Sequence, residues 1–395
     1  MNQIELILQK ELEQLQQTQN YRTLPCVEHQ GRNIVKNGHS MLNLSSNDYL
    51  GLAMDIGLRQ AFLDQLDVES FLPGSSSSRL LTGNFAIYDT LEQRLAELFG
   101  TEAALTFNSG YHANIGILPA IAHSQTLIVS DKLVHASLID GIRLSQAVHL
   151  RYRHNDYGQL EKILRKHAGQ YERIIIVTES IFSMDGDEAD LPLLVRLKNQ
   201  FGALLYIDEA HAFGVRGLNG LGCAEAAGCI KEIDFLVGTF GKSLASTGAF
   251  IVCSQVIREY LINRMRSFIF TTALPPVAIQ WTLFLLERLP SMNEKRIGLE
   301  SVSKQFRTAI QAATGDCPSS SHIVPLMIGE SSEAIACSEY LQRNGFYALP
   351  VRPPSVPENT ARIRFSLTAD IQEQDVTNLI QLVNQNPKSD IKVYS

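Results

Sequence analysis

The chain has 395 residues, a net charge of −7 and an apolar fraction of 45%, values typical of a soluble globular enzyme with room for two domains. The acidic balance argues against nucleic acid as the main partner, and no apolar run approaches the ~20 residues needed to span a bilayer. The first residues lack the basic and apolar regions of a secretory signal, so we expect a cytoplasmic protein without membrane contact.

The six cysteines and ten histidines show no spacing typical of a zinc site or a disulfide framework. Because neither C-x-x-C nor H-E-x-x-H occurs, we predict no structural metal. Buried or incidental thiols are the better interpretation of the cysteines.

Residues 1–20 carry apolar side chains at helical spacing, with Glu, Gln and Lys between them: Ile4, Ile7, Leu8, Leu12 and Leu15. This pattern predicts an amphipathic helix that packs on the body of the protein or on a partner subunit. The segment 41–51, MLNLSSNDYLG, indicates a short strand passing into a turn, because it holds the turn formers Asn47 and Asp48. Residues 1–45 are therefore expected to form an N-terminal segment of one helix and one strand.

Helical and apolar β-type segments alternate between about 90 and 285. We predict a helix at 90–100 and strands at 103–107, 126–130, 173–178, 203–208, 234–237 and 248–253. Runs such as RIIIVT and ALLYID are continuously apolar, as expected of parallel strands covered on both faces. The alternation predicts an α/β fold, with a large and mostly parallel sheet in residues 46–285 and a smaller α+β domain in residues 286–395.

Ligands of such a sheet bind beyond the carboxyl ends of its strands. Several polar or glycine candidates fall at or just past these predicted ends: Glu179 with Ser180, Asp208, Thr239, and Gly110 with Tyr111. We expect them to converge on one rim of the sheet.

The most informative segments on this rim are ALLYIDEAHAFG (203–214) and GTFGKSLAS (238–246). A lysine in a small-residue loop can hold pyridoxal phosphate as a Schiff base, and a buried carboxylate can keep its pyridine nitrogen protonated. Lys242 and Asp208 are the candidates for these two roles, and His211 could bind the cofactor's phenolate oxygen. An exposed loop lysine is the alternative for Lys242.

The same two segments also resemble an ATPase site, in which DEAH would belong to the acidic strand and GKS would end a phosphate loop. A phosphate loop needs a glycine five residues before the second one, but that position, counted from Gly241, is Leu236. The GKS element also follows the acidic strand rather than preceding it, so both features count against a nucleotide site.

Phosphate binding is predicted at FNSGYHAN (107–114), where the N–H groups of Gly110 and Tyr111 would lie at a helix N-terminus. An ordinary glycine turn is the alternative. Thr239, Ser243, Thr271 and Thr272 are further hydroxyl donors. For stacking on the ring, His135 competes with His112, and Ser183 is a possible hydroxyl partner of ring or substrate.

Three arginines lie in the segment RPPSVPENTARIRFSLTA (352–369). Arg362 and Arg364 alternate with Ile363 and Phe365, so the two arginines share one face of a strand. A guanidinium suits bidentate binding of an α-carboxylate, and a solvated edge strand is the alternative interpretation.

Together these motifs resemble the α-oxoamine synthases, fold-type-I pyridoxal phosphate enzymes that condense an amino acid with an acyl thioester. The resemblance runs from about Arg22 to the C-terminus and rests on an ordered set of motifs. They are LSSNDYLG (44–51), SRLLTGN (78–84), SGYHAN (109–114), DKLVHASLIDG (131–141), ESIFSMDGD (179–187), YIDEAHAFG (206–214), GTFGKSLAS (238–246) and ARIRFSLTA (361–369).

The resemblance implies a fold like that of aspartate aminotransferase and assigns roles by position. Lys242 would hold the cofactor, Asp208 would bind the pyridine nitrogen, and His135 would stack on the ring. Ser183 and His211 would contact the cofactor, and Gly110, Tyr111 and Thr239 would lie near its phosphate. Asn47 and Arg364 are expected near the substrate carboxylate, and Ser355 near the acyl substrate. An N-terminal arginine is also expected to bind substrate, and Arg22 is the nearest candidate. The family's homodimers imply that Thr272 reaches the partner's cofactor.

Within the family, LSSNDYLG, the short N-terminal segment and RPPSVP resemble the members that join L-alanine to a pimeloyl thioester in biotin biosynthesis. The donor would be a CoA or acyl carrier protein thioester. Two features depart from that group: Ser355 replaces an expected threonine, and GSSSSRLL (74–81) has fewer glycines. Members of the 2-amino-3-ketobutyrate ligase, 5-aminolevulinate synthase and sphingoid-base types remain alternatives, as does a cofactor-free binding protein.

Overall fold

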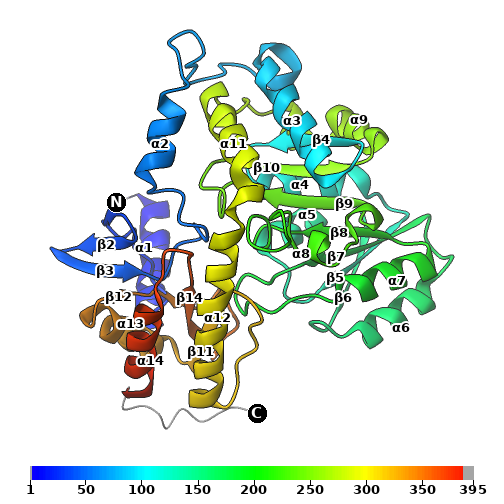
Figure 1. Ribbon diagram of the computed structural model, residues 1–395. Coiled ribbons are helices and arrows are strands. Elements are labelled where there is room, and N and C mark those ends of the chain that lie inside the picture. Colours follow the sequence, from blue (N-terminus) through cyan, green and yellow to red (C-terminus); the bar gives the residue numbers. More distant parts are fainter. Residues whose placement is uncertain (1, 386–395) are drawn as a thin grey trace. The chain divides into compact units, whose positions relative to one another are not determined.

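Two structural units share the chain in the computed structural model, which describes residues 2–385 (Figure 1). The larger unit consists of Asp48–Ser183 and Asp187–Ile297. The smaller unit combines the residues up to Asn47, the tripeptide Met184–Gly186 and the residues from Gly298 onward. The N-terminal segment thus belongs to the same unit as the C-terminal part of the chain.

A seven-stranded sheet forms the centre of the larger unit, with strand order β4-β10-β9-β8-β7-β5-β6. The strands are β4 (Ala103–Phe107), β5 (Thr126–Asp131), β6 (Val148–Tyr152), β7 (Arg173–Glu179), β8 (Leu204–Asp208), β9 (Phe235–Thr239) and β10 (Ala249–Cys253). Only β10 runs antiparallel to its neighbours, so the predicted mostly parallel sheet is confirmed.

All the strands predicted for this sheet are present, and one further strand, β6, escaped the sequence analysis. It lies at the edge of the sheet and leaves four of its five residues partly or fully exposed. Its sequence VHLRY therefore lacks the continuous apolar run that marks the central strands.

Ten α-helices of the larger unit connect and cover these strands. They are α2 (Ile56–Leu63), α3 (Ala86–Phe99), α4 (Gly110–Ile121), α5 (Ala136–Leu144), α6 (Tyr157–His167), α7 (Leu191–Phe201), α8 (Cys223–Ala226), α9 (Gln255–Arg264), α10 (Arg266–Ile269) and α11 (Pro276–Arg288). Shorter helical turns are η1 (Arg79–Gly83), η2 (Ile230–Glu232) and η3 (Leu289–Met292). Helix α3 begins one turn before the predicted start, because Tyr88 also faces the core, and it ends at Gly100 in a left-handed conformation.

The core of the larger unit lies between the sheet and the helices α4, α5 and α9. Every residue of β4, β5, β9 and β10 is buried, which explains why these strands appear in the sequence as short apolar runs. Burial on both faces fixes the positions of the strand ends, where the candidate site residues lie.

Two small sheets make up the strands of the smaller unit. One contains β1 (Glu28–Gln30), β2 (Asn33–Lys36), β3 (His39–Asn43) and β12 (Phe346–Tyr347), and the other β11 (Ile323–Gly329), β14 (Ala361–Ser366) and β13 (Pro350–Val351). The helices are α1 (Gln3–Gln17), α13 (Ser331–Arg343) and α14 (Glu373–Gln385), and along α12 (Asn293–Thr314) the chain passes from the larger unit into the smaller one. Because β14 is the central strand, the alternative of a solvated edge strand for Arg362 and Arg364 is wrong.

Helix α1 confirms the predicted N-terminal helix but not its packing on the body of the protein. None of its residues is buried, and apolar side chains such as Ile4 and Leu8 are about half exposed, at 56% and 49%. A capping box in which Asn2 and Glu5 bond to each other's backbone stabilises its first turn.

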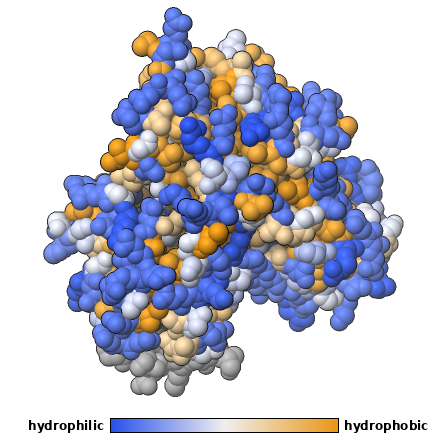
Figure 2. Space-filling model, viewed as in Figure 1, coloured by the Kyte–Doolittle hydropathy of each residue, from blue (hydrophilic) through white to orange (hydrophobic). Residues whose placement is uncertain are grey.

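Polar and apolar side chains are interspersed on the face of the molecule shown in Figure 2. Among residues 2–385, no helix is both long enough and apolar enough to cross a bilayer.

Candidate active site

The carboxyl ends of the parallel strands bring the predicted site residues of the larger unit to one rim. Asp208 ends β8, Thr239 ends β9 and Glu179 ends β7. Gly110 follows β4, and His135 follows β5. Because these strands run in the same direction, the sheet itself gathers residues that are more than 100 positions apart in the sequence.

Lys242 and His211 are in direct contact on this rim. The Nζ atom of Lys242 lies 2.8 Å from Nε2 of His211, and Nδ1 of His211 lies 2.6 Å from the hydroxyl oxygen of Tyr49. Tyr49 is fully buried and His211 nearly so. An ammonium group can only donate, so the His211 Nε2 atom accepts from Lys242 and the ring's hydrogen lies on Nδ1, facing Tyr49.

Asp208 lies at the end of β8 with only 6% of its surface exposed. One carboxylate oxygen accepts a hydrogen bond from the backbone N–H of Ala210 at 2.9 Å. The other accepts from the side-chain amide of Asn114 at 2.8 Å. A buried carboxylate with a fixed orientation of this kind is a strong partner for a cationic nitrogen.

His135 lies at the N-terminus of α5 and is exposed. Its backbone N–H donates to the buried Glu179 carboxylate at 2.6 Å. Desolvation lowers the pKa of His135, and the nearby negative charge of Asp208 offsets this shift only in part. A neutral and accessible imidazole can stack on an aromatic ring.

Burial is also the main reason why the pKa of Glu179 is raised well above its usual value, and the negative charge of Asp208 raises it further. Glu179 therefore adds a buried carboxyl group to the rim that fixes the backbone of the loop carrying His135.

The predicted phosphate region forms where α4 begins at Gly110, directly after the capping residue Ser109. A helix does not use the N–H groups of its first turn, so those of Gly110 and Tyr111 lie at an anion-binding position. A side chain at Gly110 would approach Thr239, with 3.8 Å between its Cβ and that of Thr239, so the two residues are neighbours. The hydroxyl of Thr239 is held by Gly241 N–H and the Gly248 carbonyl.

Three other candidates occupy different positions around this region. The hydroxyl of Tyr111 donates to Asp140 at 2.7 Å, and the Tyr111 side chain is 46% exposed. His112 contacts Ser109 in the first turn of α4. The backbone carbonyl of Thr272 accepts from the side chain of Asn108 at 2.8 Å, so Thr272 lies beside the start of the phosphate region in the same chain.

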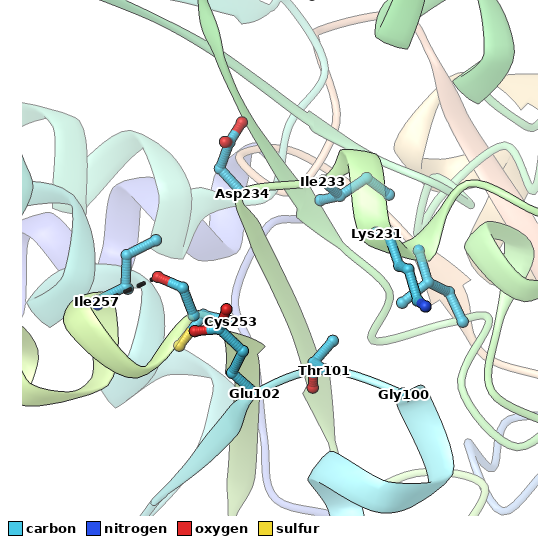
Figure 3. A pocket seen from close by; sticks show the side chains of 10 residues that line it. Gly100, Thr101, Glu102, Lys231, Ile233, Asp234, Cys253 and Ile257 are labelled. Carbon is cyan, nitrogen blue, oxygen red and sulfur yellow. Dashed lines mark hydrogen bonds between the residues drawn. The ribbon is translucent and has the colours of Figure 1, made fainter.

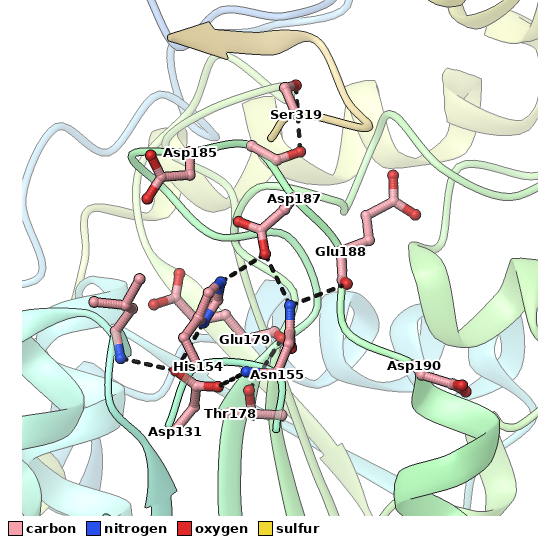
Figure 4. A network of polar contacts seen from close by, with 12 residues as sticks. Asp131, His154, Asn155, Thr178, Glu179, Asp185, Asp187, Glu188, Asp190 and Ser319 are labelled. Carbon is pink, nitrogen blue, oxygen red and sulfur yellow. Dashed lines mark hydrogen bonds and ion pairs between the residues drawn. The ribbon is translucent and has the colours of Figure 1, made fainter. Parts of the chain in front are cut away.

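Ser183 is half-buried in the loop after β7. A cluster of polar residues around His154, shown in Figure 4, binds this loop at Asp187. His154 lies between Asp131, at 3.0 Å from Nδ1, and Asp187, at 2.6 Å from Nε2. Burial by itself would lower the pKa of His154, but the hydrogen bonds and negative charges of the two aspartates outweigh it and raise the pKa to about 10. A charged His154 thus connects the end of β5, before His135, to the loop that carries Ser183.

The four predicted substrate residues form two pairs within the smaller unit. Both terminal nitrogens of Arg364 lie near the Asn47 side-chain oxygen, at 3.3 Å and 3.4 Å. Arg22 donates to the hydroxyl of Ser355 at 3.0 Å. Arg362, on the same face of β14 as Arg364, instead forms a buried ion pair with Asp185.

A cavity of about 420 Å³ in the larger unit lies away from this rim (Figure 3). Its lining includes Thr101 and Glu102, which precede β4, and Lys231 and Asp234, which precede β9. These residues lie at the amino ends of the parallel strands, opposite the ends that carry Asp208 and Thr239. The cavity therefore does not belong to the candidate site.

Sequence reasoning missed the polar residues that contact the predicted ones, chiefly Tyr49, Asn114 and Ser137. Tyr49 and Asn114 lie within the motifs LSSNDYLG and SGYHAN, and their burial, at 0% and 1% exposed, is the signal of their importance. The sequence alone does not show that these polar side chains are buried.

The donor groups on the rim fit pyridoxal phosphate. Lys242 offers a primary amine for the aldehyde, Asp208 a buried carboxylate for a pyridinium N–H, and the start of α4 backbone N–H groups for the phosphate. This donor set on a seven-stranded sheet with one antiparallel strand places the protein among the fold-type-I pyridoxal phosphate-dependent transferases.

The chain belongs to the aminotransferase class I and II family, whose family model matches residues 39–383. A relative from Haemophilus ducreyi named 8-amino-7-oxononanoate synthase is 55% identical over 379 residues, covering 94% of this chain and 98% of that protein.

Two solved structures are also similar. A serine palmitoyltransferase from S. paucimobilis with a bound PLP–myriocin aldimine has a TM-score of 0.87 and 29% identity, covering 97% of this chain and 98% of that one. An 8-amino-7-oxononanoate synthase from Francisella tularensis has a TM-score of 0.74 and 27% identity, covering 89% of this chain and 98% of that one. The predicted fold and family are confirmed.

Proposed function

We propose that the protein condenses L-alanine with a pimeloyl thioester of CoA or of acyl carrier protein. The products are 8-amino-7-oxononanoate, the free thiol and CO₂, and the reaction belongs to biotin biosynthesis. The observation that carries this proposal is the 55% identity, over 94% of the chain, to a relative named for that product. The donor groups on the rim of the larger unit support the same chemistry.

In this proposal Lys242 holds the cofactor covalently and Asp208 binds its pyridine nitrogen. His135 would stack on the ring, Ser183 and His211 would contact the cofactor, with His211 at its phenolic oxygen, and Gly110, Tyr111 and Thr239 would lie near its phosphate. When bound, the cofactor supplies an electron sink that stabilises negative charge at the substrate's α-carbon. The protein supplies orientation and proton transfer.

The proton transfer is assigned to the Nζ atom of Lys242, which takes the proton from the α-carbon of alanine and later returns one. The contact of 2.8 Å between Nζ and His211 Nε2 supports this assignment, since His211 orients the amine and can share its proton. Tyr49, 2.6 Å from Nδ1, fixes the His211 ring from behind.

The substrate carboxylate is assigned to Arg364 and Asn47, and the acyl part to Ser355 and Arg22. Both terminal nitrogens of Arg364 lie near the Asn47 oxygen, and one of them also donates to the hydroxyl of Ser366. A guanidinium can offer two N–H groups to the two oxygens of a carboxylate, which supports the assignment of Arg364. The bond between Arg22 and Ser355 supports their assignment to one substrate region.

We also propose a homodimer in which Thr272 contacts the partner's cofactor. Exposed apolar side chains near Thr272 support this: Phe270 is 71% exposed and Leu81 is 79% exposed, and the backbone bond from Ala273 to Ser77 brings their segments together. Light scattering should report a dimer, and Phe270→Asp should shift it toward the monomer. Val256→Asp, at a site 75% exposed on α9, is the matched control and should stay dimeric.

A cytoplasmic location is proposed as well. All six cysteines are free and four of them are buried, which fits a reducing compartment. Cell fractionation with an antibody against the chain tests this, and recovery in a periplasmic or membrane fraction would contradict it.

Two measurements test the activity. The purified wild-type protein should bind pyridoxal phosphate with a visible absorption band, and Lys242→Ala should lose that band. A panel of glycine, alanine and serine against acetyl, succinyl, pimeloyl and palmitoyl thioesters should then release thiol fastest with alanine and the pimeloyl donor.

The panel also tests a second candidate, condensation of serine with a palmitoyl thioester. The similarity to the serine palmitoyltransferase structure, with its TM-score of 0.87, favours including it. Faster turnover of serine than of alanine would overturn the biotin assignment and support this alternative.

A further inference from the structure

The side chain of Asn114 lies at the centre of a buried polar network behind the rim of the larger unit. Asn114 is on α4 and only 1% exposed. Its amide nitrogen donates to Asp208 at 2.8 Å and to the hydroxyl of Ser137 at 2.9 Å. Its amide oxygen accepts from the hydroxyl of Tyr206 at 2.6 Å. Both the nitrogen and the oxygen of the Asn114 side-chain amide are therefore hydrogen-bonded to buried neighbours.

The Tyr206 bond fixes which way the Asn114 amide faces. Burial raises the pKa of Tyr206 well above its usual value, and the charge of Asp208 raises it further, so the hydroxyl keeps its hydrogen and donates. The amide oxygen must then face Tyr206, and both amide hydrogens face Asp208 and Ser137.

Ser137 connects Asn114 to His135 by hydrogen bonds. The Ser137 hydroxyl lies 2.8 Å from His135 Nδ1, and the Ser137 backbone N–H donates to the same atom at 3.2 Å. A backbone N–H can only donate, so Nδ1 is an acceptor and the hydrogen of the neutral ring lies on Nε2. The side-chain amide of Asn114 therefore contacts Asp208 directly and is connected to His135 through Ser137.

The backbone around Asn114 leaves it little room to move. A Cβ atom added at Gly141 on α5 would come within 2.3 Å of the Asn114 carbonyl oxygen, so α4 and α5 touch at this point. The close contact holds the Asn114 and Ser137 side chains at a fixed separation.

We propose that Asn114 is a positioning residue that orients Asp208 and His135 together, so that the carboxylate and the stacking ring meet the cofactor in one preset arrangement. This inference rests on the proposed function, which assigns both residues to the cofactor ring. Asn114 itself does not contact the reacting atoms; it acts through its two neighbours.

The test compares the dissociation constant of pyridoxal phosphate with the thermal midpoint of the cofactor-free protein. Asn114→Ala should raise the dissociation constant about tenfold or more, because a buried hydrogen bond to a carboxylate is lost. Asn114→Asp, which keeps the shape but places a second carboxylate beside Asp208, should raise it further. Ile117→Val, one turn along α4 and fully buried, is the control: it should lower the midpoint and leave the dissociation constant unchanged.

Ser137→Ala keeps the test decisive if Asn114→Ala does not fold. It removes one hydroxyl, and with it the bonds to Asn114 and to His135 Nδ1, but keeps the bond from Asn114 to Asp208 and the Ser137 backbone N–H bond to Nδ1. It should weaken cofactor binding several-fold. Binding equal to wild type in Ser137→Ala and Asn114→Asp would overturn the inference while leaving the proposed function intact. A wild-type protein that does not bind pyridoxal phosphate would overturn both.

Discussion

Replacing His154 by glutamine should remove a pH-dependent part of the protein's stability. The pKa of His154 is raised from 6.5 to about 10 in the folded chain by Asp131 and Asp187, which outweigh the effect of burial. The contribution of protonated His154 to the stability of the folded chain is therefore fully present below pH 6.5, and it is lost as the pH rises toward about 10.

The magnitude follows from the proton that the folded chain retains. For one retained proton, each unit by which the pH rises in this range lowers the free energy of unfolding by at most about 1.4 kcal/mol. The His154 side chain is 25% exposed, so solvent weakens the interaction. We expect the free energy of unfolding of the wild type to exceed that of His154→Gln by about 2–3 kcal/mol near neutral pH. This difference should shrink by about 1–2 kcal/mol at pH 9.

Urea unfolding of the cofactor-free protein, followed by tryptophan fluorescence, measures this difference. Trp281 is the single tryptophan of the chain and lies on α11 in the same unit as His154, with its ring stacked on Phe284. His149→Gln is the control, because burial lowers the pKa of His149 and it stays neutral from pH 7 to 9. A difference between wild type and His154→Gln that is constant, or grows, from pH 7 to 9 would refute the reasoning.

Three further substitutions have defined outcomes. Gly141→Ala should destabilise by about 1–3 kcal/mol in thermal unfolding, because its Cβ would press on α4, whereas Gly158→Ala on α6 has space and should not. Glu92→Gln should cost about 3 kcal/mol, since it leaves the largely buried Arg79 and the partly exposed Arg258 without their shared carboxylate. The exposed Glu97 on the same helix is its control, and a similar loss for Glu97→Gln would contradict the argument. Arg364→Lys should raise the KM for the amino acid about tenfold by removing the bidentate geometry, with stability unchanged; an unaltered KM would exclude Arg364 from carboxylate binding.

The central strands could be predicted because their burial on both faces leaves a direct trace in the sequence. Residues 174–177 of β7 are all apolar, as are the positions of LLYID before its final carboxylate, and the carboxyl ends of the strands then locate Asp208 and Thr239. Strand β6 gave no such trace, since at the sheet edge most of its residues contact solvent.

The polar contacts behind the rim could not be predicted, because each depends on long-range packing. Asn114 meets Asp208 across 94 positions, and Arg22 meets Ser355 across 333. A lone asparagine in a helix carries no local signal of its partner. The packing of α1 was equally hidden, since an amphipathic pattern shows an apolar face without showing what covers it.

The position of β10 has a consequence for how the chain is assembled during synthesis. It lies between β4 and β9 and runs antiparallel to both, although it follows both in the sequence. Gly110, after β4, can therefore take its place beside Thr239, at the end of β9, only once the chain has been made as far as Cys253. A ribosome-bound fragment ending before β10 should thus lack the anion-binding corner.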